Sequence, residues 1–328
     1  MLSSTTIPVN HFYLKDTFDS GQPLAFHANY DQFSDTLTYV SGTHIINVRF
    51  SGTRTVGSLT IVGKDIRFAS ADVHTRFRLS DDMEHYYEEI ATDDFMRTAI
   101  EKYNGMRLTL NDPWETTLCF IISQYNNMKR IRSIVRNIIN RYGAPIRDEE
   151  DKTIARSFPG SADLMLASEK DLEECGAGFR AKYIKEAAAY CTENLDLAKL
   201  RNKKYDALKE ELLTITGVGD KVADCIALMG YGKLEAFPID VWVERTLERA
   251  YFKGKKKPIK ELHKFATKRW GEYAGYAQQY IFWHGMHLIP ESEIQKEQEE
   301  ANAPTEPPPP KKAKPPRPKK PRKPAKKG

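Results

Sequence analysis

Cysteine is scarce in this sequence, and long apolar runs are missing from it. The four cysteines, Cys119, Cys175, Cys191 and Cys225, lie far apart and form no CxxC pair. This spacing argues against a zinc site and against a disulfide framework. The N-terminus has no apolar segment of the signal-peptide kind, and no stretch is long enough to span a membrane. We therefore expect a soluble, intracellular protein without a zinc site. We also expect that it needs no metal or other cofactor and acts as a monomer.

Positive charge is concentrated at one end of the chain. Residues 301–328 hold ten Lys and Arg against one acid, Glu306, which gives this segment a charge of +9. The whole chain of 328 residues carries only +5, so subtracting the segment leaves −4 for residues 1–300. Ten prolines lie from Pro304 onward. We expect residues 291–328 to be a disordered Lys/Pro-rich tail on a mildly acidic body.

The first third of the sequence has the period of β-strands. Apolar and polar residues alternate over 36–40, 45–50 and 58–62. Turn signals rich in Gly, Ser and Asp separate these runs, as in a meander of antiparallel strands. The first helix is predicted from Met83 to Ile100. We therefore predict an N-terminal antiparallel sheet domain over residues 1–110.

The remainder has the period of α-helices almost throughout, up to Pro290. A helical domain is therefore predicted over residues 111–290, which makes the fold α+β. The predicted helices lie near 113–125, 127–142, 151–156, 161–167, 169–174, 179–193, 196–201, 205–214, 220–230, 241–252, 258–270 and 273–285.

The segment 208–243 contains the most informative motif. One predicted helix ends near residue 214 and the next begins near residue 220, with Gly217-Val218-Gly219 in the turn between them. The two glycines let the backbone turn sharply and leave N–H groups pointing outward, which is an arrangement that binds phosphate. Lys221 lies in the first turn of the second helix, and Asp240 takes the N-cap position of the following helix. An amine and a carboxylate beside a phosphate clamp indicate chemistry on a nucleotide.

The runs TGVGDKVADCIAL and AFPIDVWV resemble the helix-hairpin-helix, Gly/Pro-rich loop and aspartate of base-excision DNA glycosylases. The lysine is similar to that of bifunctional glycosylase/lyase members, and VADC resembles the 8-oxoguanine DNA glycosylase family in particular. The resemblance covers roughly residues 10–290. It implies a twisted antiparallel sheet flanking an all-helical helix-hairpin-helix body, with DNA in the cleft between two helical subdomains. Endonuclease III-like relatives carry a four-cysteine iron–sulfur loop, and no cysteine follows Cys225 here, so no cluster is expected.

The resemblance implies catalytic roles for Lys221 and Asp240. The Lys221 amine would displace the base at the sugar C1′ and leave a Schiff base that permits β-elimination. Its pKa should then be lowered, by desolvation or by the positive potential of the hairpin amides. Asp240 would stabilise positive charge on the sugar and help to deprotonate the lysine. The simpler alternatives are a lysine that contacts phosphate and an aspartate that only caps its helix.

Four residues are implied in holding a flipped base. Cys225 shares a helix face with Lys221 and would contact the base, or it is an ordinary buried thiol. Gln278 and Phe282, also four residues apart, would bind the base edge and its other face, or they belong to an amphipathic helix packed into the core. Gly21 would offer its carbonyl to the N7 hydrogen that 8-oxoguanine has and guanine lacks, or it is simply a turn.

The resemblance also implies that two helix connections open the duplex. Tyr125 would fill the space that the base vacates, where the family has asparagine, and Phe179 would wedge the duplex. By their positions, Arg130 and Arg180 would contact the orphaned cytosine. Alternatively, they are solvated surface charges. The family's histidine two residues after the aspartate is Trp242 here, so that phosphate contact is not carried over. The predicted DNA-binding residues are Gly217, Val218, Gly219, Tyr125, Asn126, Asn127, Arg130, Phe179 and Arg180.

The favoured prediction is a bifunctional 8-oxoguanine DNA N-glycosylase and AP lyase of base excision repair. Its partner would be double-stranded DNA with 8-oxoguanine opposite cytosine. Two alternatives stay open: a glycosylase of the same fold for another damaged base, and a non-catalytic helix-hairpin-helix module. The basic tail is expected to bind DNA phosphates without reading sequence. Such a protein would act in the cytoplasm or nucleoid of a prokaryote, or in a nucleus.

Overall fold

The computed structural model describes residues 2–290, and the residues up to His287 form one compact unit. The predicted tail over 291–328 lies outside the described residues. Within residues 2–290, no helix has the length and apolar character needed to cross a bilayer.

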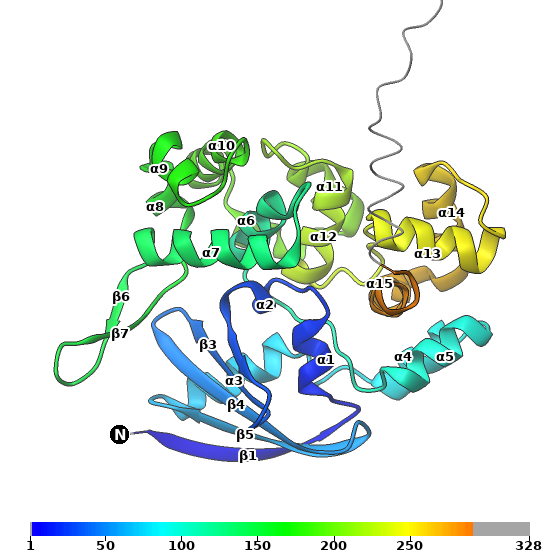
Figure 1. The fold of residues 1–328 in the computed structure, drawn as a ribbon, viewed down its shortest axis with the longest axis horizontal. Helices are drawn as coiled ribbons and strands as arrows, with labels where there is room; N and C mark the ends of the chain where they lie inside the picture. Colours follow the sequence, from blue (N-terminus) through cyan, green and yellow to red (C-terminus); the bar gives the residue numbers. More distant parts are fainter. Residues whose placement is uncertain (1, 291–328) are drawn as a thin grey trace, which may run out of the picture. The chain divides into compact units, whose positions relative to one another are not determined.

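An antiparallel sheet of five strands forms the N-terminal part of the molecule (Figure 1). The strand order is β1-β5-β4-β3-β2, and the strands are β1 (Ser3–Asn10), β2 (Asn29–Asp31), β3 (Thr36–Ser41), β4 (His44–Gly52) and β5 (Val56–Gly63). The strands predicted from alternation are confirmed, because all three runs fall in β3, β4 and β5. Alternate side chains such as Leu37, Ile46 and Ile61 are fully buried, and helix α3 (Ile66–Arg76) packs against the sheet.

Helices α1 (Leu14–Asp19), α2 (Leu24–His27) and α3 all precede Met83 and were not predicted, although α3 is 11 residues long. Helices α1 and α2 are only 6 and 4 residues long, too short to establish a periodic pattern. The helix predicted from Met83 to Ile100 is instead two helices, α4 (Met83–Ile90) and α5 (Asp94–Lys102). The break arises because the Asp93 carboxylate caps α5, accepting a hydrogen bond from the Met96 N–H at 2.9 Å.

Residues 113–288 are mainly helical, so the predicted α+β architecture is confirmed. One predicted helix, at 151–156, is wrong, because β7 (Thr153–Arg156) pairs with β6 (Pro145–Arg147). Between them the Asp148 carboxylate accepts hydrogen bonds from two following N–H groups at 3.0 and 2.9 Å and stabilises a turn. The helical elements are α6 (Pro113–Ser123), α7 (Met128–Tyr142), α8 (Ser161–Met165), α9 (Glu169–Glu174), α10 (Arg180–Glu193), η1 (Leu197–Asn202), α11 (Tyr205–Leu212), α12 (Asp220–Tyr231), α13 (Val241–Phe252), α14 (Ile259–Trp270), η2 (Gly271–Tyr273) and α15 (Ala274–Leu288). The domain boundary at residue 110 stays a prediction.

Helix α15 connects the elements that carry the predicted site. It packs closely on two neighbours through glycines: a Cβ on Gly275 would lie 2.3 Å from Leu228 of α12, and one on Gly285 would lie 1.9 Å from Thr246 of α13. Its Tyr276 hydroxyl also donates a hydrogen bond, at 2.6 Å, to the segment before α4. One helix therefore fixes the N-terminal part relative to α12 and α13.

Candidate active site

The turn between α11 and α12 forms the predicted hairpin. Gly217 has a left-handed φ of 84°, and a Cβ at this position would lie 2.9 Å from Tyr183, so only glycine fits. Gly219 is exposed and occupies the N-cap of α12, whose first N–H groups have no partner within the helix. The Gln124 side chain donates to the Gly217 carbonyl at 2.9 Å and ties the hairpin to the end of α6. The hairpin is confirmed, and its binding to phosphate stays a prediction.

Lys221 lies in a half-buried position at the start of α12. Its Nζ is 5.1 Å from the centroid of the Phe120 ring, and it interacts with Cys225 and Asp240. Burial alone would lower the pKa of the Lys221 amine, but Cys225 and the Asp240 carboxylate outweigh burial and the pKa is raised. The predicted lowering of this pKa is therefore wrong for the protein alone, because Cys225 and Asp240 together outweigh desolvation. The amine is protonated at neutral pH and must lose a proton before it can attack.

Asp240 caps α13, as predicted. One oxygen, Oδ1, accepts hydrogen bonds from the Trp242 and Val243 N–H groups at 3.0 and 2.9 Å. Burial raises the pKa of Asp240, against the opposing effects of Lys221 and of these N–H groups. Because the cap uses only Oδ1, the cap and a role beside Lys221 are compatible.

Cys225 lies one turn after Lys221 in α12 and is only 3% exposed. Burial raises the pKa of its thiol to about 11, although Lys221 opposes this. The thiol is therefore neutral at neutral pH, and it adds a polarisable wall beside the amine. This placement fits both readings of the sequence, a wall of the base pocket and a buried thiol.

The structure brings Gly21 and Phe282 together, although 261 positions separate their numbers in the chain. Gly21 has a φ of 76°, and a Cβ there would lie 3.2 Å from the Phe282 ring and 3.7 Å from Met128. Gln278, one turn before Phe282 in α15, is 5% exposed, and its Oε1 is buried without a hydrogen-bond partner among the described residues. An unpartnered buried acceptor is costly, so this amide is suited to a polar ligand.

The two predicted DNA-opening connections meet at Arg180. Arg180 is 2% exposed, so the alternative of a solvated surface charge is wrong for this residue. It donates to the carbonyls of Gln124 at 2.8 Å and Tyr125 at 2.9 Å, and it lies 4.3 Å from the Phe179 ring centroid. Burial and the nearby Arg130 lower the pKa of Arg180. One buried arginine therefore holds both connections.

The tips of these connections are open to solvent. Tyr125 is 94% exposed with a left-handed φ of 48°, and Phe179 is 58% exposed. The two asparagines that follow Tyr125 have structural bonds: the Asn126 amide donates to the Ile122 carbonyl at 3.0 Å, and Asn127 caps α7. The aromatic tips are thus the parts available for contact, while the asparagines shape the loop.

Sequence reasoning missed a buried charge cluster behind the lysine. Asp224 of α12 is fully buried and contacts Lys209 at 2.8 Å and the Tyr205 hydroxyl at 2.6 Å, both from α11. These contacts hold the two hairpin helices together. The i, i+4 spacing of Tyr205 and Lys209 was the available signal, but it does not reveal which residue they face.

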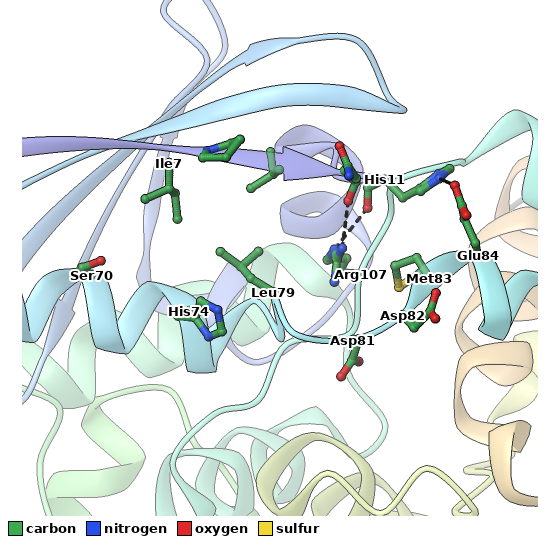
Figure 2. Close-up of a pocket in the computed structure, with 13 residues that line it drawn as sticks. Ile7, His11, Ser70, His74, Leu79, Asp81, Asp82, Met83, Glu84 and Arg107 are labelled. Atoms are coloured by element: carbon green, nitrogen blue, oxygen red, sulfur yellow. Dashed lines mark hydrogen bonds and ion pairs between the residues drawn. The ribbon is translucent and has the colours of Figure 1, made fainter.

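A cavity of about 510 Å³ lies away from the predicted site residues, none of which lines it (Figure 2). It lies beside the end of β1, between α3 and the start of α4. Arg107 borders it but uses its guanidinium on the Asn10 and His11 carbonyls at 2.8 and 3.1 Å. Pro8, which also borders it, has no N–H to offer from the strand. This cavity is therefore not the candidate active site.

Comparison with known proteins points to one family. Residues 4–117 match the model of the 8-oxoguanine DNA glycosylase N-terminal domain, and residues 118–272 match the HhH-GPD superfamily of base excision DNA repair proteins. A probable N-glycosylase/DNA lyase of Methanothermobacter thermautotrophicus is 32% identical over 228 residues, which is 63% of this chain and 72% of that protein. The N-glycosylase/DNA lyase of Saccharomyces cerevisiae is 31% identical over 240 residues, covering 63% of this chain and 64% of the yeast protein.

Two solved structures share the fold across most of the chain. MBOgg1, bound to a low-affinity DNA ligand, has a TM-score of 0.79 and 30% identity, covering 88% of this chain and 99% of its own. The Clostridium acetobutylicum 8-oxoguanine glycosylase/lyase, in complex with double-stranded DNA containing cytosine opposite 8-oxoguanine, has a TM-score of 0.79 and 28% identity, covering 88% and 98%. The likeness includes both the sheet part and the helical body.

Proposed function

Since the chain belongs to the 8-oxoguanine DNA glycosylase family of the HhH-GPD superfamily, we propose that it is a bifunctional DNA N-glycosylase/AP lyase that excises 8-oxoguanine from duplex DNA. The observation that carries this proposal is the placement of Lys221. Its amine lies at the start of α12, close enough to Asp240 and Cys225 for both to act on its charge, and the first N–H groups of that helix would bind a backbone phosphate.

The chemistry uses two side chains. Asp240 takes a proton from the Lys221 ammonium, and the freed amine attacks C1′ of the damaged nucleotide as the bond to the base breaks. The base leaves with the electron pair of that bond and takes up the proton that Asp240 had accepted, which restores the Asp240 carboxylate. Loss of the ring C–O bond gives a Schiff base between Lys221 and the sugar. Removal of a C2′ proton then expels the 3′ phosphate by β-elimination. The Asp240 carboxylate stabilises the positive charge that develops on the sugar.

Recognition of the base uses the segment around Gly21 and one face of α15. The Gly21 carbonyl would accept the N7 hydrogen of 8-oxoguanine, a donor that guanine lacks. The buried Oε1 of Gln278 would accept a hydrogen bond from the edge of the base. Phe282 and Cys225 would cover the two faces of the base. A Cβ built on Gly21 would lie 3.2 Å from the Phe282 ring, which supports placing the two residues at one binding site.

Opening of the duplex uses the exposed aromatics. Tyr125 fills the vacated space and Phe179 wedges the duplex, and stacking on bases suits both rings. Arg130 is exposed and can approach the orphaned cytosine directly. Arg180 would contact the same base only after exchanging its bonds to the Gln124 and Tyr125 carbonyls. The proposed partner is therefore duplex DNA with 8-oxoguanine opposite cytosine, in whichever compartment holds the DNA.

A panel of duplexes tests this function against its alternatives. Single-turnover excision is measured on 8-oxoguanine opposite cytosine, on an alkylated purine and on an oxidised pyrimidine, with strand cleavage followed in parallel. We expect excision and cleavage on the first duplex and little on the other two. Preferred excision of another lesion would replace the substrate assignment. Binding to all three without excision would indicate a non-catalytic module.

A further inference from the structure

Two buried glutamines hold the Gly21 segment from opposite sides. Gln22 is 1% exposed, and its side-chain amide donates to the Arg107 carbonyl at 2.8 Å and to the Ser20 hydroxyl at 3.0 Å. Its Oε1 accepts from the Thr109 N–H at 2.7 Å. The segment that follows Gly21 is therefore anchored to the chain between α5 and α6.

Gln279 anchors the segment that precedes Gly21. It is 2% exposed, and its Nε2 donates to the Ser20 carbonyl at 2.7 Å. The bond reaches from α15 to a loop 259 positions earlier in the chain. Gln279 directly follows Gln278 and lies three residues before Phe282, so one helix carries the base-edge amide, the aromatic plate and the anchor.

The hydrogen bond from Gln279 to the Ser20 carbonyl restricts Gly21, a residue whose backbone has unusual conformational freedom. The Ser20 carbonyl and the Gly21 N–H belong to the same peptide unit, so fixing that carbonyl restricts φ of Gly21. A glycine explores positive and negative φ about equally, whereas this loop needs the value of 76°. The same φ brings Gly21 against the Phe282 ring. Without Gln279, the peptide could rotate and carry the Gly21 carbonyl out of line.

We propose that Gln279 is a specificity-determining positioning residue, which holds the Gly21 carbonyl in register with Gln278 and Phe282. The inference rests on the proposed function, because that carbonyl matters only if it reads the N7 hydrogen of 8-oxoguanine. Small displacements of a binding group have large effects on a pre-organised site. Gln279 takes no part in the chemistry at Lys221 and Asp240, so its effect is confined to steps that need the base.

The test compares base excision with cleavage at a preformed abasic site, which needs no base recognition. For Gln279→Leu, single-turnover excision of 8-oxoguanine opposite cytosine should fall about tenfold, the effect expected from leaving one buried carbonyl unpaired. Selectivity over guanine should fall with it. Cleavage of the abasic duplex should stay within about twofold of wild type. Tyr276→Phe is the matched control, since it removes a buried hydrogen bond of the same helix at a distance from this loop.

Gln279→Glu gives a second readout that a merely structural role would not move. As a carboxylate, the new side chain cannot donate to the Ser20 carbonyl, whereas the protonated acid can. The ratio of excision to abasic cleavage should therefore increase as the pH falls from about 8 to 6 in this variant, relative to the same ratio in wild type. For Gln279→Leu, the ratio of excision to abasic cleavage should depend on pH in the same way as it does in the wild-type protein.

Three outcomes decide the matter. Excision and abasic cleavage lost to the same extent in Gln279→Leu would overturn the inference, because the residue would then be only structural. Wild-type excision and selectivity in that variant would overturn it as well. Wild-type protein that cleaves abasic DNA but does not excise 8-oxoguanine would instead refute the proposed function, which keeps the two failures distinct.

Discussion

The base-reading side of the site and the DNA-opening side are built in opposite ways. Buried glutamines hold the Gly21 loop: Gln22 donates to the Arg107 carbonyl, and Gln279 donates to the Ser20 carbonyl. The Oε1 of Gln278 is also buried, and it has no hydrogen-bond partner among residues 2–290. Tyr125 and Phe179 present exposed aromatic rings to solvent, and the buried Arg180 holds the Tyr125 carbonyl and one face of the Phe179 ring. Under the proposed function, recognition would be pre-organised during folding, whereas opening would rely on rings that gain contacts only when DNA binds. Substitutions on the two sides should fail in different steps.

Removal of the nucleophile should have the largest effect. Lys221→Gln should reduce single-turnover excision by roughly four orders of magnitude or more, the scale seen when a catalytic nucleophile is lost. Affinity for the duplex should stay close to wild type, because backbone N–H groups form the hairpin clamp. Both quantities are measured by quenched-flow cleavage and by fluorescence anisotropy. A variant that still excises the base would show that Lys221 acts only as a phosphate contact.

Loss of the charge at the cap should have the next largest effect. Asp240→Asn keeps an oxygen that can accept the Trp242 and Val243 N–H bonds, so α13 should stay capped. The chemical step should slow by roughly two orders of magnitude or more, because the carboxylate no longer stabilises the sugar cation. The readout is the single-turnover rate together with the thermal midpoint. Near-normal rates would reduce Asp240 to a helix cap.

A side chain on the base-reading loop should act through the pocket. Gly21→Ala places a Cβ 3.2 Å from the Phe282 ring, at a φ that costs alanine about 1–2 kcal/mol. Excision should fall between about tenfold and a hundredfold, while cleavage of preformed abasic DNA persists. Gly42→Ala is the matched control, because its φ of 57° brings the same strain with no atom within 4 Å of the added Cβ. Equal losses in both variants would mean that strain, not the pocket, is responsible.

Local features of the site were predictable from sequence, and long-range contacts were not. The hairpin and the Asp240 cap depend on residues within a few positions of one another, where spacing alone fixes the geometry. Two hydrogen bonds join segments that are far apart in the chain. One runs from Gln279 to the Ser20 carbonyl, and the other runs from Arg180 to the Tyr125 carbonyl. Residue types and spacing contain no signal for such pairs.

The direction of the Lys221 pKa shift also could not be predicted from the sequence. Desolvation and the hairpin amides both favour a lowered pKa for Lys221, and these were visible from the motif. The opposing effects of Cys225 and Asp240 depend on distances that only the folded chain defines. The missed turn at Asp148 and the cap at Asp93 have a similar origin, since one acidic side chain diverts an otherwise helical pattern.

The smallest expected effect is on the opening side. Tyr125→Ala should weaken binding to the lesion duplex and slow excision about tenfold, since base–aromatic stacking contributes roughly 1–3 kcal/mol. Selectivity for 8-oxoguanine over guanine should be unchanged, because the pocket residues are untouched. Phe33→Ala, which removes a ring that is 93% exposed in the turn between β2 and β3, serves as the control. A change in base selectivity for Tyr125→Ala would break the contrast between the two sides.

The central claim is that the Lys221 amine forms the covalent bond to DNA. The direct measurement is borohydride trapping of the wild-type protein on a duplex with 8-oxoguanine opposite cytosine, followed by proteolysis and mass spectrometry of the cross-linked peptide. We expect one cross-link, at Lys221, and no cross-link in Lys221→Gln. A cross-link at another amine, or base excision by wild type without any trapped complex, would contradict the claim.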